Sequence, residues 1–155
     1  MIRTKREYEV ALKKLAQNDE ALSKQREELE KLELSNEDID LAMSSLINFR
    51  NQLEEEIKIY EGIKSRDWNL ILNLADPHHI GRFLIALRLA YDLSQRDLAK
   101  LSGVTEAQVS KDEINEYHGI SFDRAVKIME IFGVKSLSPE INKNLNRKDL
   151  FAVNE

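Results

Sequence analysis

The chain has 155 residues, of which 42% are hydrophobic and 33% charged, with a formal net charge of −5; this is typical of a globular protein with one ordinary domain, or with a small domain and an extension. It contains no cysteine, which excludes disulfides and thiolate metal sites. Because no apolar run approaches the ~20 residues that span a bilayer, and the first residues lack the apolar stretch of a signal peptide, we expect a soluble, cytoplasmic protein with no membrane partner.

Two long helices are predicted at the start of the chain, where the first sixty residues contain neither glycine nor proline. Apolar residues recur there with the heptad spacing of a helical seam, in two registers. The first register is Tyr8, Leu12, Leu15, Leu22 and Leu29, and the second is Ile39, Met43, Leu46, Leu53, Ile57 and Tyr60. Between them, Ser35 followed three residues later by Asp38 is typical of a capped helix start. The pattern predicts helices over residues 4–33 and 36–64, folded as an antiparallel, coiled-coil-like hairpin.

The predicted hairpin has more apolar positions than one seam needs, among them Ile47, Phe49, Ile59 and Ile63. These side chains either widen the seam, pack on the rest of the chain, or cover a second hairpin in a dimer. A lone two-helix hairpin buries too little surface to be very stable, so we expect residues 1–64 to hold a homodimer together. The residues expected at its interface are Leu15, Leu22, Leu29, Met43, Leu46, Leu53, Ile57 and Tyr60.

Residues 65–75 are expected to form a connector with an apolar stretch from Trp68 to Leu74. Asp76 and Pro77 then favour a helix start, since aspartate is a good N-cap and proline suits the first helical position. From there to residue 134 the pattern predicts five short helices, followed by a tail over residues 135–155. The predicted fold is therefore all-α, with the hairpin first and the short helices after it.

The most informative stretch lies at residues 94–113. Ser94 is a suitable cap for a helix over residues 95–102, and Gly103 supplies the left-handed turn that ends it. Thr105 caps a second helix over residues 106–113, and the small Ala99 lies where the two helices would cross. Two helices joined at a steep angle by a glycine-containing turn are what a helix-turn-helix requires.

The spacing of Gln95, Ala99, Gly103 and Val109 resembles the helix-turn-helix of XRE-type (lambda-repressor/Cro-like) transcriptional regulators. Residues 87–93 resemble the first helix of that family, and residues 121–134 resemble its fourth and fifth helices. The resemblance implies a five-helix DNA-binding domain over residues 76–134. It also implies a sequence-specific regulator, expected to be a repressor that binds double-stranded DNA at a palindromic operator as a dimer.

In this family the second motif helix enters the major groove, which implies the side chains that face DNA in this chain. On the second helix these are Glu106, Ala107, Gln108, Ser110 and Lys111, while Gln95 and Thr105 sit where helix N-termini meet phosphates. Gln108 is suited to adenine, and Lys111 to guanine or phosphate. Glu106 either accepts from cytosine or only supplies a favourable charge at the helix start. The resemblance also implies a buried ion pair between Arg88 and Glu113.

The loop over residues 113–119 is longer and less basic than in many members of that family. It resembles the loop of a subset that includes some HigA-like antitoxins with an N-terminal helical extension, which implies a toxin as a further protein partner. Asn115, Tyr117 and His118 are expected to contact the DNA backbone. For Tyr117 the alternative is that it packs beneath the helix that follows.

Residues 76–134 carry seven basic and nine acidic side chains, so DNA binding must depend on where the cations lie. The rival hypothesis is a helix-turn-helix protein that acts through protein interaction, with the acidic hairpin as its working surface. The three histidines (His78 and His79 adjacent, His118 alone) do not form a metal site, and no catalytic motif is present. We therefore predict no enzyme activity, no metal and no cofactor.

Overall fold

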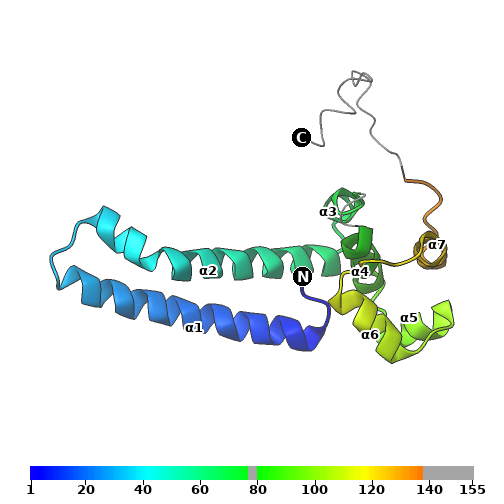
Figure 1. The fold of residues 1–155 in the computed structure, drawn as a ribbon, viewed down its shortest axis with the longest axis horizontal. Helices are drawn as coiled ribbons and strands as arrows, with labels where there is room; N and C mark the ends of the chain where they lie inside the picture. The colour runs from blue at the N-terminus through cyan, green and yellow to red at the C-terminus, as the bar shows by residue number, and fades with distance from the viewer. Residues whose placement is uncertain (77–79, 138–155) are drawn as a thin grey trace, which may run out of the picture.

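A computed structural model describes residues 1–76 and 80–137 of the chain. Within these residues all regular structure is helical, with seven helices and no strand, so the all-α prediction is confirmed. Figure 1 shows a long helical hairpin that projects from a cluster of short helices. No helix of the described residues is long and apolar enough to cross a membrane.

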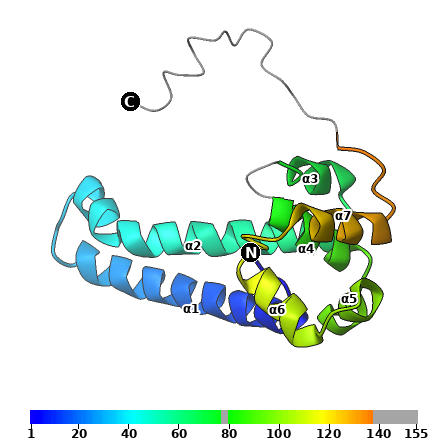
Figure 2. The same cartoon turned by 45° about the vertical axis from the view of Figure 1, so that its right-hand side comes forward.

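The hairpin consists of α1 (Lys5–Glu30) and α2 (Asn36–Lys64). The hydroxyl of Thr4 caps α1 by accepting from the Glu7 N–H at 3.1 Å, and that of Ser35 caps α2 by accepting from the Asp38 N–H at 3.2 Å. The first helix ends three residues before its predicted end, because Glu33 takes a left-handed φ of 54° and turns the chain. The two helices lie antiparallel in both views (Figures 1 and 2), as predicted.

The seam between α1 and α2 is formed within one chain. Tyr8 stacks on Tyr60 with ring centroids 4.8 Å apart, and Asn18 donates to the Leu46 carbonyl oxygen at 3.1 Å. Four of the residues predicted at a dimer interface are buried, namely Met43, Leu53, Ile57 and Tyr60; the other four, Leu15, Leu22, Leu29 and Leu46, are half-buried. Contacts within one chain therefore cover much of the apolar surface from which the dimer was predicted.

The predicted connector contains a helix of its own, α3 (Trp68–Asn73), which Asp67 caps. Ile71 of α3 is fully buried, so the apolar stretch forms an ordered turn of helix that docks on the core. The predicted helix start at Pro77, together with His78 and His79, lies outside the described residues. After them α4 (Ile80–Ala90) is buried at nine of its eleven positions, as expected for a helix at the centre of a core.

Three further helices surround α4: α5 (Gln95–Ser102), α6 (Glu106–Ile114) and α7 (Phe122–Ile131). Residues 121–134, which were expected to contain two helices, form α7 alone, because nothing interrupts it before Gly133 takes a left-handed φ of 70°. Among the described residues, five short helices do follow the hairpin, but the first of them is α3. Of the predicted tail, residues 138–155 lie outside the described part.

A single cluster of buried apolar residues joins the hairpin to the short helices. Ile2 and Ile63 belong to the same cluster as Phe83, Leu84 and Leu98. Polar contacts reinforce the junction, since the Arg66 side chain donates to the Ala90 carbonyl oxygen at 2.9 Å and Lys64 pairs with Asp92. The root of the hairpin is therefore packed into the same core as the helix-turn-helix.

Candidate nucleic-acid interface

The helices α5 and α6 and the turn between them have the arrangement of a helix-turn-helix. Ser94 and Asp97 form a reciprocal capping box at the start of α5, and Gly103 ends the helix with a φ of 72°. The Thr105 hydroxyl caps α6 by accepting from the Gln108 N–H at 3.2 Å. Leu98, Ala99 and Val109 are buried between the elements, so local caps set the two helix starts and apolar packing holds the angle between them.

One side of α6 faces away from the rest of the protein (Figure 2). Glu106, Ala107 and Lys111 are exposed, and Ser110 is half-buried. Thr105, the N-cap, is also exposed. These five predicted DNA-facing residues therefore share an accessible surface at the start and middle of α6, which a helix needs if it is to enter a groove.

Gln108 is held by a chain of side-chain contacts that the sequence prediction did not include. Its amide nitrogen donates to one carboxylate oxygen of Asp112 at 2.7 Å, and the guanidinium of Arg124 on α7 donates to the other at 2.5 Å. A glutamine reads adenine with both its nitrogen and its oxygen, so Gln108 must leave Asp112 to do so. The four-residue spacing of Gln108 and Asp112 on a helix was the signal available in the sequence.

A buried ion pair lies behind α6. Arg88 donates from Nε to Glu113 Oε1 at 2.5 Å and from Nη2 to Oε2 at 2.7 Å. The two side chains are 3% and 0% exposed. Arg88 also donates to the carbonyl oxygens of Leu93 at 2.7 Å and Arg3 at 2.9 Å. The guanidinium thus connects α4 to α6, to the turn before α5, and to the segment before α1.

Gln95, expected at a phosphate, points partly inward. Its amide nitrogen donates to Glu113 Oε2 at 2.8 Å, and its side chain is half-buried. The carboxylate of Glu113 is therefore hydrogen-bonded by Arg88 and Gln95 together, which is how a buried charge is stabilised. In this structure the first residue of α5 supports the core of the motif.

The loop after α6 separates the three residues predicted in it. Asn115 and His118 are exposed, whereas Tyr117 is only 3% exposed. Among the described residues the Tyr117 hydroxyl has no hydrogen-bond partner, and burial, followed by the nearby Glu113 charge, raises the pKa of Tyr117 well above its ordinary value. Asn115 and His118 are thus accessible to a ligand, and Tyr117 is a packing residue.

Tyr117 packs against the start of α4. A Cβ atom added at Gly81 of α4 would lie 1.8 Å from the Glu116 carbonyl oxygen and 3.1 Å from the Tyr117 Cβ. Glu116 and Tyr117 both have left-handed φ angles, 47° and 56°, a conformation that is unfavourable outside glycine. The glycine on α4 therefore allows a strained loop to approach the helix closely.

The described residues contain no group of three histidine, aspartate or glutamate side chains that could hold a metal ion. Arg96, Lys100 and Lys111 are exposed on α5 and α6, while Lys127 on α7 donates to the Ser102 carbonyl oxygen at 2.7 Å and so caps the end of α5.

Comparison with known proteins identifies the same region. Residues 84–138 match a family model described as helix-turn-helix, which is of the XRE type. The matched region starts within α4 and includes α5, α6 and α7, while the hairpin lies outside it. No curated protein and no solved structure matches the chain.

Proposed function

We propose that this chain is a sequence-specific regulator of transcription that binds double-stranded DNA by inserting α6 into the major groove. The observation that carries the proposal is the exposed face of α6, set on a buried ion pair inside a region that matches the helix-turn-helix family. We further propose that it acts as a repressor, with two copies bound to a palindromic operator, because DNA-binding modules of this kind read two half-sites as dimers.

In this proposal Gln108 and Lys111 are the candidates for reading bases, and the residues around them contact the groove. Lys111 is exposed and reaches either a guanine edge or a phosphate. Gln108 reads its base only after exchanging the Asp112 contact for the base edge, since its amide nitrogen is otherwise committed. Thr105, Ala107 and Ser110 lie at the start and on the accessible side of the helix, so they contact the groove wall and the phosphates beside it. Glu106 either accepts from cytosine or only supplies a favourable charge at the helix start.

The test is to select binding sites for the full chain from a random duplex pool and then to titrate the selected DNA with variants. Gln108→Ala is expected to lose ~1–3 kcal/mol of discrimination at one base pair. Lys111→Ala has the same effect if Lys111 reads guanine. If Lys111 contacts phosphate, the loss is uniform over sequences and the salt dependence becomes shallower. Lys31→Ala, an exposed lysine at the far end of the hairpin, is the matched control.

A pool that yields no enriched sequence, with no binding of the full chain even at low salt, contradicts the proposal. In that case the second candidate function gains weight, in which the chain acts by binding a protein. The observation in favour of it is a group of exposed leucines at the hairpin turn, Leu32, Leu34 and Leu41, since exposed apolar patches mark interaction sites. An antitoxin would combine both functions, with the toxin bound at the hairpin.

That second function is tested by expressing the chain together with the product of the adjacent reading frame. Co-purification that is lost in Leu41→Glu, while DNA binding is retained, assigns the hairpin turn to a protein partner. Co-purification that is equal in both forms, or its absence, contradicts the assignment.

A further inference from the structure

The first turn of α1 lies beside the helix-turn-helix. Thr4 and Lys5 line a groove of about 360 Å³ together with Ser94 and Gln95 at the start of α5 and Glu106 at the start of α6. The hydrogen bond from Arg88 to the Arg3 carbonyl oxygen fixes this position. Both ribbon views show the dark blue start of α1 next to α6 (Figures 1 and 2). The hairpin therefore begins at the edge of the candidate interface.

The same part of α1 has a charge opposite to that of the chain as a whole. The first fourteen residues contain two acidic residues, Glu7 and Glu9, and five basic ones: Arg3, Lys5, Arg6, Lys13 and Lys14. The chain in total carries −5. Four of these five cations are exposed, all except Arg3. The basic residues are therefore concentrated at the root of the hairpin, where α1 meets the motif.

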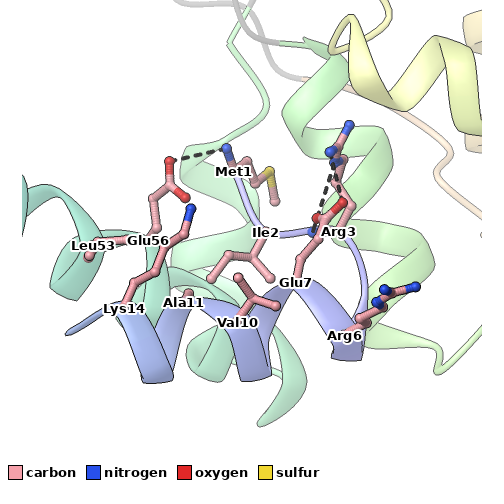
Figure 3. A pocket seen from close by; sticks show the side chains of 10 residues that line it. All are labelled: Met1, Ile2, Arg3, Arg6, Glu7, Val10, Ala11, Lys14, Leu53 and Glu56. Atoms are coloured by element: carbon pink, nitrogen blue, oxygen red, sulfur yellow. Dashed lines mark hydrogen bonds and ion pairs between the residues drawn. The ribbon is translucent and has the colours of Figure 1, made fainter. Parts of the chain in front are cut away.

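The close view in Figure 3 shows how these charges are arranged. Arg3 forms an ion pair with Glu7, in which Arg3 Nη2 donates to Glu7 Oε1 at 2.8 Å. Arg6 extends outward from α1 beyond this pair. Lys5 lies 3.9 Å from Glu9 in an exposed pair, and such a pair contributes little and leaves the lysine free to bind elsewhere. Lys5 thus lines the groove at the starts of α5 and α6, and Arg6 follows it directly in the chain as a second exposed cation in the first turn of α1.

A polyanion bound by α6 would pass this surface. In a docked helix-turn-helix the first motif helix crosses the DNA backbone near its own start, and here Lys5 lines the same groove as the start of α5. DNA affinity rests largely on lysine and arginine that displace counterions from phosphates. Residues 76–134 carry more acidic than basic side chains, so cations from outside this region are needed to bind the phosphates.

We infer that the DNA interface extends from α5 and α6 onto the first turn of α1, where Lys5 and Arg6 bind phosphates of the duplex that α6 enters. This inference rests on the proposed function. It gives the root of the hairpin a direct role in DNA binding, in addition to its role in the core. Because phosphate contacts are independent of sequence, the contribution of these two residues is the same on any duplex.

The test uses the full chain and the double variant Lys5→Gln, Arg6→Gln, titrated against mixed-sequence duplex DNA at several salt concentrations. The control is Lys24→Gln, Lys31→Gln, which removes the same charge from exposed lysines farther along the first helix and at its end. Each lost phosphate contact reduces the slope of log affinity against log salt by about 0.9. We expect a reduction close to twice that in the first variant and no change in slope for the control, with unchanged helix content in both.

The outcomes separate the inference from the function on which it rests. If the unaltered chain binds duplex DNA and the Lys5, Arg6 variant keeps its slope, the inference is wrong and the proposed function stands. An equal reduction of slope in the control variant also overturns it, because the effect is then one of total charge. Absence of binding by the unaltered chain at low salt overturns both.

Discussion

Arg88 joins the parts of the protein that surround the recognition helix. Its guanidinium donates to Glu113 and to the carbonyl oxygens of Leu93 and Arg3. Replacing it with methionine leaves a fully buried carboxylate without its charged partner, which costs ~3–5 kcal/mol. We expect Arg88→Met to lower the free energy of unfolding by about that amount, as measured by urea denaturation of the full chain. DNA binding should be lost through unfolding and not through a missing contact.

A double variant separates the ion pair from the packing around it. If Glu113→Leu is added to Arg88→Met, no unpaired charge remains, so the double variant should be destabilised by clearly less than the sum of the two single changes. Single changes that are small and additive would mean that the pair is solvated and does not hold the motif together.

Asp97 makes the start of α5 sensitive to pH. Its carboxylate accepts from the Ser94 hydroxyl at 2.6 Å and from the Ser94 N–H at 3.0 Å, and these hydrogen bonds lower the pKa of Asp97 below its ordinary 3.8. A carboxyl whose pKa is lower in the folded protein contributes stability that is complete above 3.8 and disappears as the pH falls through the lowered value. Asp97→Asn should therefore be less stable than the parent near neutral pH.

The difference in the free energy of unfolding between Asp97→Asn and the parent should shrink as the pH falls below 3.8. Denaturation at a series of pH values measures it. Asp123→Asn, in the first turn of α7 and exposed, is the control for the general effect of an acidic residue near a helix start. A difference between Asp97→Asn and the parent that does not depend on pH would contradict the capping role of the ionised carboxylate.

At the scale of elements, the contact of α4 with the loop after α6 depends on a glycine, Gly81, which has no side chain to separate them. A Cβ at Gly81 would lie 1.8 Å from the Glu116 carbonyl oxygen, and backbone atoms on both sides leave little room for adjustment. Overpacking of this kind costs ~1–3 kcal/mol or more. Gly81→Ala should therefore lower the thermal unfolding midpoint, and should displace the loop that carries Asn115 and His118.

Gly62→Ala in α2 is the matched control for Gly81→Ala. The added Cβ would lie 2.9 Å from Leu70 Cδ1, the far end of a flexible side chain. Alanine is also favoured over glycine in a helix by about 1 kcal/mol, so this change should be neutral or stabilising. Equal destabilisation by the two substitutions would show that the close approach at Gly81 is not the cause of the lost stability.

At the scale of the whole molecule, the position of the exposed apolar surface bears on the proposed homodimer. One such group lies at the hairpin turn and includes Leu41; a second lies on α3 and just after α4, where Trp68, Leu72 and Tyr91 line a groove. Half-sites one helical turn apart require recognition helices roughly 34 Å apart. The hairpin turn is about 39 Å away along α1, at 1.5 Å for each of its 26 residues. The second surface, close to the motif, therefore suits the pairing better.

We propose that two copies pair through the surface around Leu72. Leu72 is 59% exposed and Leu41 is 75% exposed, so glutamate at either position should leave the fold intact. We expect Leu72→Glu to sediment as a monomer and to bind a palindromic operator weakly, because tethering of the second domain is lost. Leu41→Glu should remain a dimer.

The reverse result would assign the dimer to the hairpin, as the heptad pattern predicts. A full chain that sediments as a monomer at high micromolar concentration would exclude the homodimer. Deletion of the hairpin is a poor test of either surface, because Ile2, Ile57 and Ile63 belong to the core that the short helices share.

The sequence by itself determined the local structure of this protein. Ser35, Ser94 and Thr105 each cap the helix expected from them, and Gly103 provides the expected left-handed end. These signals could be read because a cap joins groups three residues apart, so its energetics depend on neighbours in the chain. The residues of α6 expected to face DNA came from the family resemblance, and of these Glu106, Ala107 and Lys111 are exposed. Arg88 and Glu113 are twenty-five residues apart, and only the family resemblance brought them together.

Only the tertiary structure decided which surfaces meet. Periodicity shows that a helix has an apolar face, but the partner of that face depends on burial summed over the whole chain. The seam residues Met43, Leu53, Ile57 and Tyr60 are accordingly buried against their own chain, whereas Leu12 is exposed. The helix α3 forms where a connector was expected. Gln95 turns inward because the buried carboxylate of Glu113 needs a second donor. Tyr117 is buried because Gly81, distant in sequence, lets the loop approach α4.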